Sequence, residues 1–292
     1  MLKKNNIKEI YNLPSTVKFC KRCVISNQRP RIVFDDEGVC SACRFADHKK
    51  NVINWKDREK ELSELCDRHR SNDDSYDVIV PGSGGKDSNY VAHMLREKYN
   101  MHPLVVTWAP HIYTDIGKKN LTSLVDSGFD NILITPNGEV HKKLTKAAFL
   151  EMGDPFQPFI FGQYSAPFRV AIQYKIPLVF YGENSEVEYG GDMSAAFVPT
   201  RDWKSKNTNI LMSGVPPESF TEYGISIKDM APYFPPSNDK LEEMDLEIHY
   251  MGHYTKWIPQ ECYYYSVEHT GFKANPVRSE GTYSKYASLD DK

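Results

Sequence analysis

The sequence lacks an excess of positive charge. Its 292 residues carry 36 Lys and Arg against 39 Asp and Glu, which gives a formal net charge of −3. A protein that holds a polyanion over a wide surface needs a basic patch or stripe, and none is apparent along this chain. We therefore expect no nucleic-acid partner.

Long apolar runs are also absent. The longest, such as residues 176–181, stop far short of the roughly 18 residues that a membrane-spanning helix needs. The first residues lack the apolar core of a secretory signal. These absences predict a cytoplasmic protein without a membrane span. In that compartment thiols stay reduced, so the six cysteines are interpreted first as ligands, nucleophiles or core residues.

What is present divides the chain into five parts, and no internal repeat is apparent. The expected parts are a polar leader (1–16), a cysteine-rich module (17–48), a linking helix (49–75), a central α/β region (76–190) and an aromatic, proline-punctuated C-terminal region that completes the site (191–292).

The central region alternates unbroken apolar runs with helical patterns. The expected strands are 77–80, 103–109, 131–135 and 176–182. This alternation predicts an α/β fold of Rossmann-like type, with a parallel sheet covered on both faces and ligands at the carboxyl ends of the strands. Residues 154–167, rich in aromatics, are expected to be irregular and either to line a substrate pocket or to cover the sheet.

A glycine-rich loop follows the first expected strand. Glycines before a helix N-terminus favour an anion, because backbone N–H groups can approach it closely. The loop does not fit a Walker A motif, since Asp87 follows Lys86 where a Ser or Thr is required. It does not fit G-x-G-x-x-G either, because the third glycine would fall at Asp87.

The loop residues instead resemble the SGGxDS loop of the PP-loop ATPases, which cleave ATP between the α and β phosphates. They are Ser83, Gly84, Gly85, Lys86, Asp87 and Ser88. The resemblance implies that the two serines and the backbone of the loop hold pyrophosphate, and that Asp87 organises Mg²⁺. Lys86 is expected to contact ATP and to act in catalysis.

The same resemblance implies further nucleotide contacts at the carboxyl ends of other strands. The candidates are Thr107 and Trp108, whose backbone would meet the adenine, together with Gly182 and Lys285. For the cations near the C-terminus, Arg278 and Lys285, two interpretations stay open: contact with ligand phosphates, or ordinary surface charge.

Two cysteine pairs, Cys20-x₂-Cys23 and Cys40-x₂-Cys43, have the spacing of a four-thiolate zinc ribbon. The residues between the pairs are expected to form a hairpin with its turn at 36–38. Four protein ligands fill a tetrahedron, so the zinc would be structural. Iron–sulfur ligation is the alternative. The isolated Cys66 and Cys262 are expected to be packing residues.

An acidic loop follows the fourth expected strand. It contains Glu183, Asn184, Glu186 and Glu188. Carboxylates at this edge are suited to Mg²⁺, to sugar hydroxyls or to protons from an attacking ammonia. We assign catalysis to Glu183 and Glu186. Substrate binding is assigned to four other residues: Asn184, Glu188, Gln163 and Arg278. A solvated acidic loop is the alternative.

In combination, these motifs resemble the N-acetyl sugar amidotransferase family. The segments that carry the resemblance, spread over residues 17–287, are "CKRCVISNQRPRIVFDDEGVCSAC", "SGGKDS", "TWAP", "PFQPFIFGQ", "VFYGENSEVEYGG" and "EGTYSKY". That family acts in surface-polysaccharide and flagellin-glycan pathways, including acetamidino sugars of lipopolysaccharide O-antigen and of pseudaminic or legionaminic acids. Its members extend some tens of residues beyond the end of this chain.

The resemblance implies an ATP-dependent conversion of an acetamido group of an N-acetylated sugar to an acetamidino group. AMP and pyrophosphate would be released. Ammonia would come from a partner glutaminase resembling the subunits of imidazole glycerol phosphate synthase, since this chain has no recognisable glutaminase module. Two other functions remain: a tRNA-thiolating PP-loop enzyme, and a non-catalytic scaffold that binds zinc and nucleotide and docks a glutaminase.

Overall fold

The computed structural model describes residues 7–10, 12–191, 193–200, 215, 217–279, 282–287 and 289. Its elements, in chain order, are α1 (Ile7–Ile10), α2 (Ser41–Asn51), α3 (Trp55–His69), β1 (Val78–Pro81), α4 (Lys86–Glu97), β2 (Pro103–Trp108), α5 (Asp115–Asp126), β3 (Asp130–Ile134), α6 (Gly138–Met152), α7 (Gln157–Tyr174), β4 (Leu178–Tyr181), α8 (Ser185–Glu188), η1 (Met193–Phe197), η2 (Pro217–Tyr223), η3 (Ala231–Tyr233), α10 (Asn238–Glu243), β5 (Glu247–Tyr250), α11 (Met251–Tyr254) and α12 (Pro259–Thr270).

A five-stranded parallel sheet organises the chain, in the order β3-β2-β1-β4-β5. Successive residues of β1 point to opposite faces, so Ile79 joins one core while Val78 and Val80 join the other. Burial on both faces explains why the strands are unalternated apolar runs. The predicted fold class, a parallel α/β sheet with a cysteine module before it, is confirmed.

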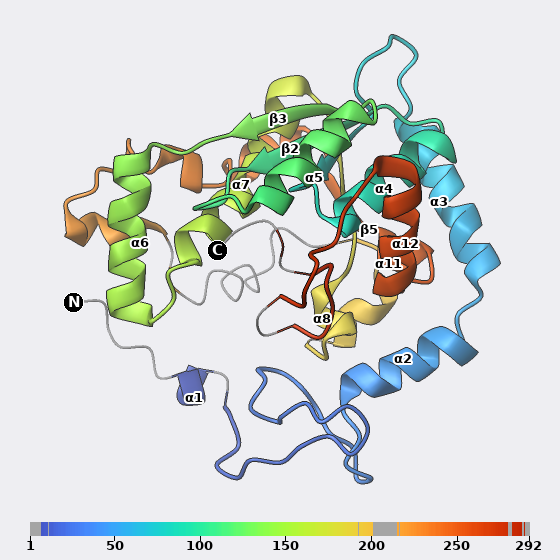
Figure 1. The fold of residues 1–292 in the computed structure, drawn as a ribbon, viewed down its shortest axis with the longest axis vertical. Coiled ribbons are helices and arrows are strands. Elements are labelled where there is room, and N and C mark those ends of the chain that lie inside the picture. The colour runs from blue at the N-terminus through green and yellow to red at the C-terminus, as the bar shows by residue number, and fades with distance from the viewer. Residues whose placement is uncertain are drawn as a thin grey trace.

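Helices cover both faces of the sheet. The core around Ile79 includes side chains from α6, α7, η2, η3 and α10, and the core around Val78 includes side chains from α3, α4, α5, α11 and α12. Cys66 and Cys262 are buried in the second core, as their predicted packing role requires. In Figure 1, α4 and α12 lie side by side, although residues of the two helices are far apart in the sequence.

The expectation that residues 154–167 are irregular was wrong, because α7 begins at Gln157. Pro158 is tolerated because the first-turn N–H groups of a helix have no intrahelical partner. Gly162 then lets the helix approach β2: a Cβ there would lie 2.0 Å from the Trp108 ring. Packing of α7 against the sheet therefore outweighs the presence of Pro167 inside the helix.

Two further differences concern the helices and strands outside the expected set. The linking helix predicted over 49–75 is present as α3, which the Asn54 side chain caps, but it is preceded by an unpredicted helix, α2, that begins inside the cysteine module and ends at Asn51. The fifth strand, β5, was not predicted. It pairs in parallel with β4, so the C-terminal part of the chain contributes directly to the sheet.

The cysteine module lies at the N-terminal end and contacts α8. Figure 1 shows this module, in blue, with α8 between it and the sheet. The predicted hairpin between the cysteine pairs is present as a tight turn: Phe34 bridges Cys40 in antiparallel fashion, and Asp35 N–H donates to Val39 O at 3.0 Å.

Candidate functional site

The glycine loop connects β1 to α4, and hydrogen bonds to β2 hold its first residue in place. Gly82 N–H donates to Val106 O at 2.9 Å, and Thr107 Oγ1 donates to Gly82 O at 2.6 Å. Gly84 has a φ of +88°, and a Cβ there would lie 2.5 Å from the backbone N of Leu121. Only glycine fits this position, so the loop conformation is specified by its own sequence.

The first turn of α4 points its N–H groups toward the loop. Gly85 is the N-cap and supplies no side-chain acceptor, so the helix start retains donors and partial positive charge for an anion. Ser88 Oγ donates to Gly85 O at 3.0 Å, which keeps this hydroxyl at the turn. The structure therefore brings the predicted phosphate-binding residues together at one helix start.

Lys86 and Asp87 form the polar centre of the loop. Lys86 Nζ donates to Asp87 Oδ2 at 2.5 Å, with the Lys86 side chain 10% exposed. The other oxygen, Asp87 Oδ1, is buried and has no hydrogen-bond donor among the described residues. A buried carboxylate oxygen without a donor is an available ligand for a hard cation such as Mg²⁺.

The C-terminal region closes the loop from the side. Ser266 Oγ of α12 donates to Lys86 O at 2.8 Å, and Lys86 Nζ lies 5.6 Å from the centre of the Tyr286 ring. Tyr286 stacks on Tyr263, with ring centres 4.6 Å apart. Tyr286 belongs to the segment "EGTYSKY", so part of this segment lies beside the glycine loop.

The turn after β4 lies against the same loop. A Cβ on Gly182 would lie 3.5 Å from Asp87 Cβ and 2.7 Å from the Trp257 ring. Tyr189 donates its hydroxyl to Glu183 Oε2 at 2.6 Å. Burial raises the pKa of Glu183, and the Asp87 charge raises it further, while the Tyr189 hydrogen bond and Lys86 lower it. Glu183 is thus a partly desolvated carboxyl beside the loop.

The other two acids of this turn are paired with cations of the N-terminal region. Arg31 Nη1 lies 2.5 Å from Glu186 Oε2, and Lys49 Nζ lies 2.5 Å from Glu188 Oε2. Asn184 caps α8 by accepting from Glu186 N–H at 3.1 Å. Sequence reasoning missed both cations, because they lie 155 and 139 residues from their partners and belong to no local motif.

The remaining predicted residues differ in how they are placed. Trp108 is buried and packs edge-on against Tyr233, with ring centres 5.3 Å apart. Gln163 is exposed on α7, and Arg278 and Lys285 are exposed in the C-terminal segment, where Lys285 O accepts from Asn275 N–H at 2.8 Å. Glu280, between these two cations, lies outside the described residues.

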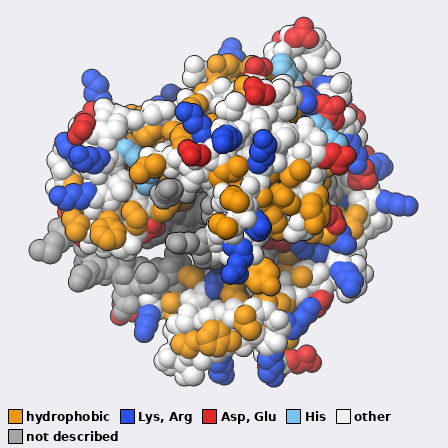
Figure 2. Space-filling model, in the orientation of Figure 1, with side chains coloured by type: hydrophobic (Ala, Val, Ile, Leu, Met, Phe, Trp, Pro, Cys, Tyr) orange, Lys and Arg blue, Asp and Glu red, His pale blue; other side chains and the backbone are white. Residues whose placement is uncertain are grey.

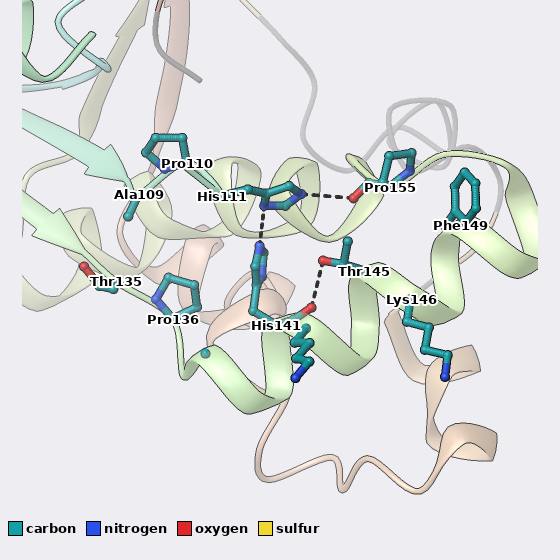
Figure 3. Close-up of a pocket in the computed structure, with 12 residues that line it drawn as sticks. Ala109, Pro110, His111, Thr135, Pro136, His141, Thr145, Lys146, Phe149 and Pro155 are labelled. Atoms are coloured by element: carbon teal, nitrogen blue, oxygen red, sulfur yellow. Dashed lines mark hydrogen bonds between the residues drawn. The ribbon is translucent and has the colours of Figure 1, made fainter. Parts of the chain in front are cut away.

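A pocket of about 550 Å³ opens where β2 and β3 end. Ala109 and Pro110 line it after β2, Thr135 and Pro136 after β3, and residues of α6 complete it. In Figure 3 the ring of His141 stands on α6 and faces His111. Both strands end on the sheet edge that carries the glycine loop, so the loop and the pocket open at the same edge.

Hydrogen bonds beside this pocket join its two histidines to the surrounding residues. Pro155 O can only accept, so His111 Nε2 donates to it at 3.1 Å. His111 Nδ1 lies 2.7 Å from His141 Nε2, and His141 Nδ1 lies 2.8 Å from the Tyr233 hydroxyl. Burial lowers the pKa of His141 to about 4, and His111 adds to this. The His141 ring is therefore neutral near pH 7.

Four cysteine sulfurs meet in the N-terminal module. The Sγ atoms of Cys20, Cys23, Cys40 and Cys43 all lie within 4.8 Å of one another. The pairs Cys20–Cys43 and Cys23–Cys40 are 4.0 and 3.6 Å apart. Burial opposes ionisation of Cys20, but backbone N–H groups directed at its sulfur outweigh it and lower the pKa to about 6. The cluster can hold a metal ion through thiolates.

Comparisons with known proteins give distant structural matches. No protein-family model matches the chain, and no curated protein matches it. Among the described residues, no helix is both long and apolar enough to span a membrane.

Three solved structures illustrate the matches. An NH3-dependent NAD synthetase from Campylobacter jejuni is 13% identical, covers 66% of this chain and 92% of its own, and has a TM-score of 0.34. The U34-tRNA thiolase NcsA from Methanococcus maripaludis, with its [4Fe-4S] cluster, is 15% identical, covers 92% of this chain and 76% of its own, and has a TM-score of 0.34. An NMN synthetase from Francisella tularensis is 12% identical, covers 77% of this chain and 99% of its own, and has a TM-score of 0.32.

Proposed function

We propose that this protein is an ATP-dependent, AMP-forming amidotransferase of the PP-loop superfamily that converts an acetamido group of an N-acetylated sugar to an acetamidino group. The observation that carries the proposal is the complete Ser83–Ser88 loop at the start of α4, in which Asp87 Oδ1 has no donor among the described residues. Glu183 lies beside this loop on the turn after β4.

The nucleotide fits along the carboxyl edge of the sheet. Its phosphates would lie at the first turn of α4, with Mg²⁺ on Asp87 and the Lys86 ammonium close by. Neighbouring parallel strands are about 4.8 Å apart. The pocket at the ends of β2 and β3 therefore lies within reach of the nucleoside half, next to Ala109 and Pro110. The imidazole rings of His111 and His141 line this pocket, and His141 is neutral, which suits an uncharged base such as adenine.

The reaction joins two displacement steps. The amide oxygen of the sugar attacks the α phosphorus, which forms a C–O–P bond and expels pyrophosphate. Ammonia then attacks the activated carbon, loses a proton, and AMP leaves with the former amide oxygen. A base is needed for that proton, and the raised pKa of Glu183 brings this carboxyl closer to neutral pH than an ordinary glutamate.

The cysteine cluster fits a single zinc ion. Sulfurs about 2.3 Å from zinc at the corners of a tetrahedron lie about 3.8 Å apart. Two of the sulfur pairs, at 4.0 and 3.6 Å, agree with this spacing, whereas an iron–sulfur cluster has to fit several metal atoms between its cysteines. Bound zinc would supply folding energy and no reaction step, because four thiolates leave no open position.

The partners follow from the same proposal. The substrate is an N-acetylated sugar of O-antigen, lipopolysaccharide or flagellin-glycan synthesis in the cytoplasm, and the ammonia comes from a glutaminase resembling subunits of imidazole glycerol phosphate synthase. The charge distribution disfavours a nucleic acid: the net charge is −3, and on the face of the described residues that Figure 2 shows, Lys and Arg are scattered among Asp and Glu.

Thiol chemistry is the main alternative, as in a tRNA-thiolating enzyme, and the two other cysteines argue against it. Cys66 and Cys262 are buried, and burial raises the pKa of each thiol to about 12. Thiolates are the reactive form, so neither residue is suited to attack. A scaffold without turnover remains the non-enzymatic alternative.

The test is an ATP assay with ammonium chloride and a panel of acetamido sugars. We expect AMP and pyrophosphate to form only with the correct sugar, and a new amidine to be detected on that sugar by mass spectrometry. ADP as the product, or AMP formation driven by tRNA and by no sugar, would contradict the proposal. ATP binding with no turnover when purified glutaminase and sugar are both supplied would favour the scaffold.

A further inference from the structure

The metal-binding knuckle of the cysteine module packs directly on the turn that follows α8. Ser41 and Ala42 lie between the cluster residues Cys40 and Cys43. Gly190 has a φ of +77°, and a Cβ on it would lie 3.0 Å from Ser41 Oγ and 3.2 Å from the backbone N of Ala42. This glycine permits the acidic turn and the knuckle to meet without a side chain between them.

Two ion pairs extend the contact along α8. The Lys49–Glu188 pair is the more enclosed, with the two side chains 12% and 14% exposed, and Lys49 Nζ also donates to Trp257 O at 3.4 Å. The Arg31–Glu186 pair is 28% and 27% exposed. Because Trp257 also packs against Gly182, the cations of the N-terminal region hold both ends of the turn that carries Glu183.

A third contact leads from the module to Glu183 itself. The Arg29 guanidinium lies 5.6 Å from the centre of the Tyr189 ring, and Tyr189 donates its hydroxyl to Glu183 Oε2 at 2.6 Å. Glu183 in turn interacts electrostatically with Asp87 and Lys86. A continuous set of contacts therefore joins the cysteine module to the glycine loop.

We propose that Arg31 of the cysteine module and Lys49, directly after it, are positioning residues that fix α8 so that Glu183 stays beside Asp87. The module then acts on the nucleotide site without touching ATP. This inference rests on the proposed ATP site, but it does not depend on which acceptor the enzyme uses. Misplacing a carboxyl next to the Asp87 cation site would weaken Mg·ATP binding even in the absence of a sugar.

The test compares Arg31→Gln, Glu186→Gln and the double variant in the full chain. Mg·ATP affinity is measured by calorimetry without sugar, and zinc content and the unfolding temperature are measured for each protein. We expect each single variant to weaken Mg·ATP binding by about 3- to 10-fold, a range typical of coupled neighbours, with zinc retained. The double variant should be no weaker than the singles, because Arg31 acts through Glu186.

Arg22→Gln is the matched control. Arg22 lies in the same module and pairs with Asp47, but the two side chains are 48% and 50% exposed, and Asp47 lies on α2 rather than α8. The Arg22→Gln substitution removes the same positive charge from the module as Arg31→Gln does, and it should leave Mg·ATP affinity unchanged. Lys49→Arg should preserve affinity and Lys49→Met should lower it, which tests the second pair independently.

Three results would overturn the inference: unchanged affinity in Arg31→Gln, additive losses in the double variant, or losses that follow zinc release and appear equally in Arg22→Gln. Wild-type protein that binds Mg·ATP but forms no AMP with any sugar would refute the proposed reaction only. Wild-type protein that does not bind Mg·ATP would refute both.

Discussion

The loop after β1 and the turn after β4 lie side by side at one edge of the sheet, yet they are built in opposite ways. The loop is specified locally: Gly84 fits where no other residue can, and Lys86 pairs with its own neighbour Asp87. The turn is held from outside, by Arg31 and Lys49, which are more than a hundred residues away in sequence. One half of the candidate site is thus recognisable from six consecutive residues, whereas the other half is recognisable only in the folded structure.

The largest expected effect comes from the local half. Asp87→Asn should lower sugar-dependent AMP formation by about 100-fold or more, since charge placed at the reacting phosphates is usually the dominant catalytic contribution. The measurement is initial rates of AMP release, with circular dichroism to check the fold. Asp126→Asn, an exposed position at the end of α5, is the control and should keep full activity. Comparable rates for the two variants would place the chemistry elsewhere.

Next in size is the loss of a thiolate from the module that supports the turn. Cys20→Ser should release the metal and lower the free energy of unfolding by several kcal/mol, because a structural metal stabilises only the folded state. Zinc content and urea unfolding give the measurement. Cys66→Ala should also destabilise, through lost packing, but should keep its zinc. Full zinc occupancy in Cys20→Ser would show that the cluster is not the metal site.

A smaller loss of stability is expected when the loop backbone is altered. Gly84→Ala introduces a Cβ 2.5 Å from Leu121 N at a φ of +88°, and a left-handed non-glycine residue alone costs about 1–2 kcal/mol. Gly224→Ala has a similar φ of +71° with no atom within 4 Å, so it measures the backbone strain without the clash. Gly84→Ala should be the more destabilising of the two in thermal unfolding and should lose ATP affinity, which Gly224→Ala should keep.

The smallest expected effect concerns the pH dependence of the turn. Burial raises the pKa of Glu183 in the folded protein, so the folded state binds more protons than the unfolded state between the usual glutamate pKa and the raised value. The free energy of unfolding should therefore fall as the pH rises through that window, and Glu183→Gln should flatten the change. Urea titrations from pH 4 to pH 8 would measure it. Parallel profiles for wild type and variant would mean that Glu183 is not desolvated.

The same comparison explains what the sequence could predict. Unbroken apolar runs identified four strands, and the six loop residues and four cysteines were recognisable from local spacing alone. β5 was missed because "EIHY" alternates polar and apolar residues and is not an unbroken apolar run like the other four strands. In the structure its two polar residues, Glu247 and His249, pair with each other at 2.9 Å. The first half of α7 was missed because its packing on Trp108 outweighs the helix-breaking tendency of its prolines. The partners of Glu186 and Glu188 had no local signal at all.

The fifth strand and the helix after it have a consequence for the order in which the site can form. β5 pairs with β4, and α12 supplies Ser266 to the backbone of Lys86, so the glycine loop receives its last support from the final tenth of the chain. A growing polypeptide cannot complete this site until residues near 270 have left the ribosome. A fragment ending before β5 would retain every loop residue and still expose an unpaired edge at β4, which makes it a candidate for aggregation rather than for nucleotide binding.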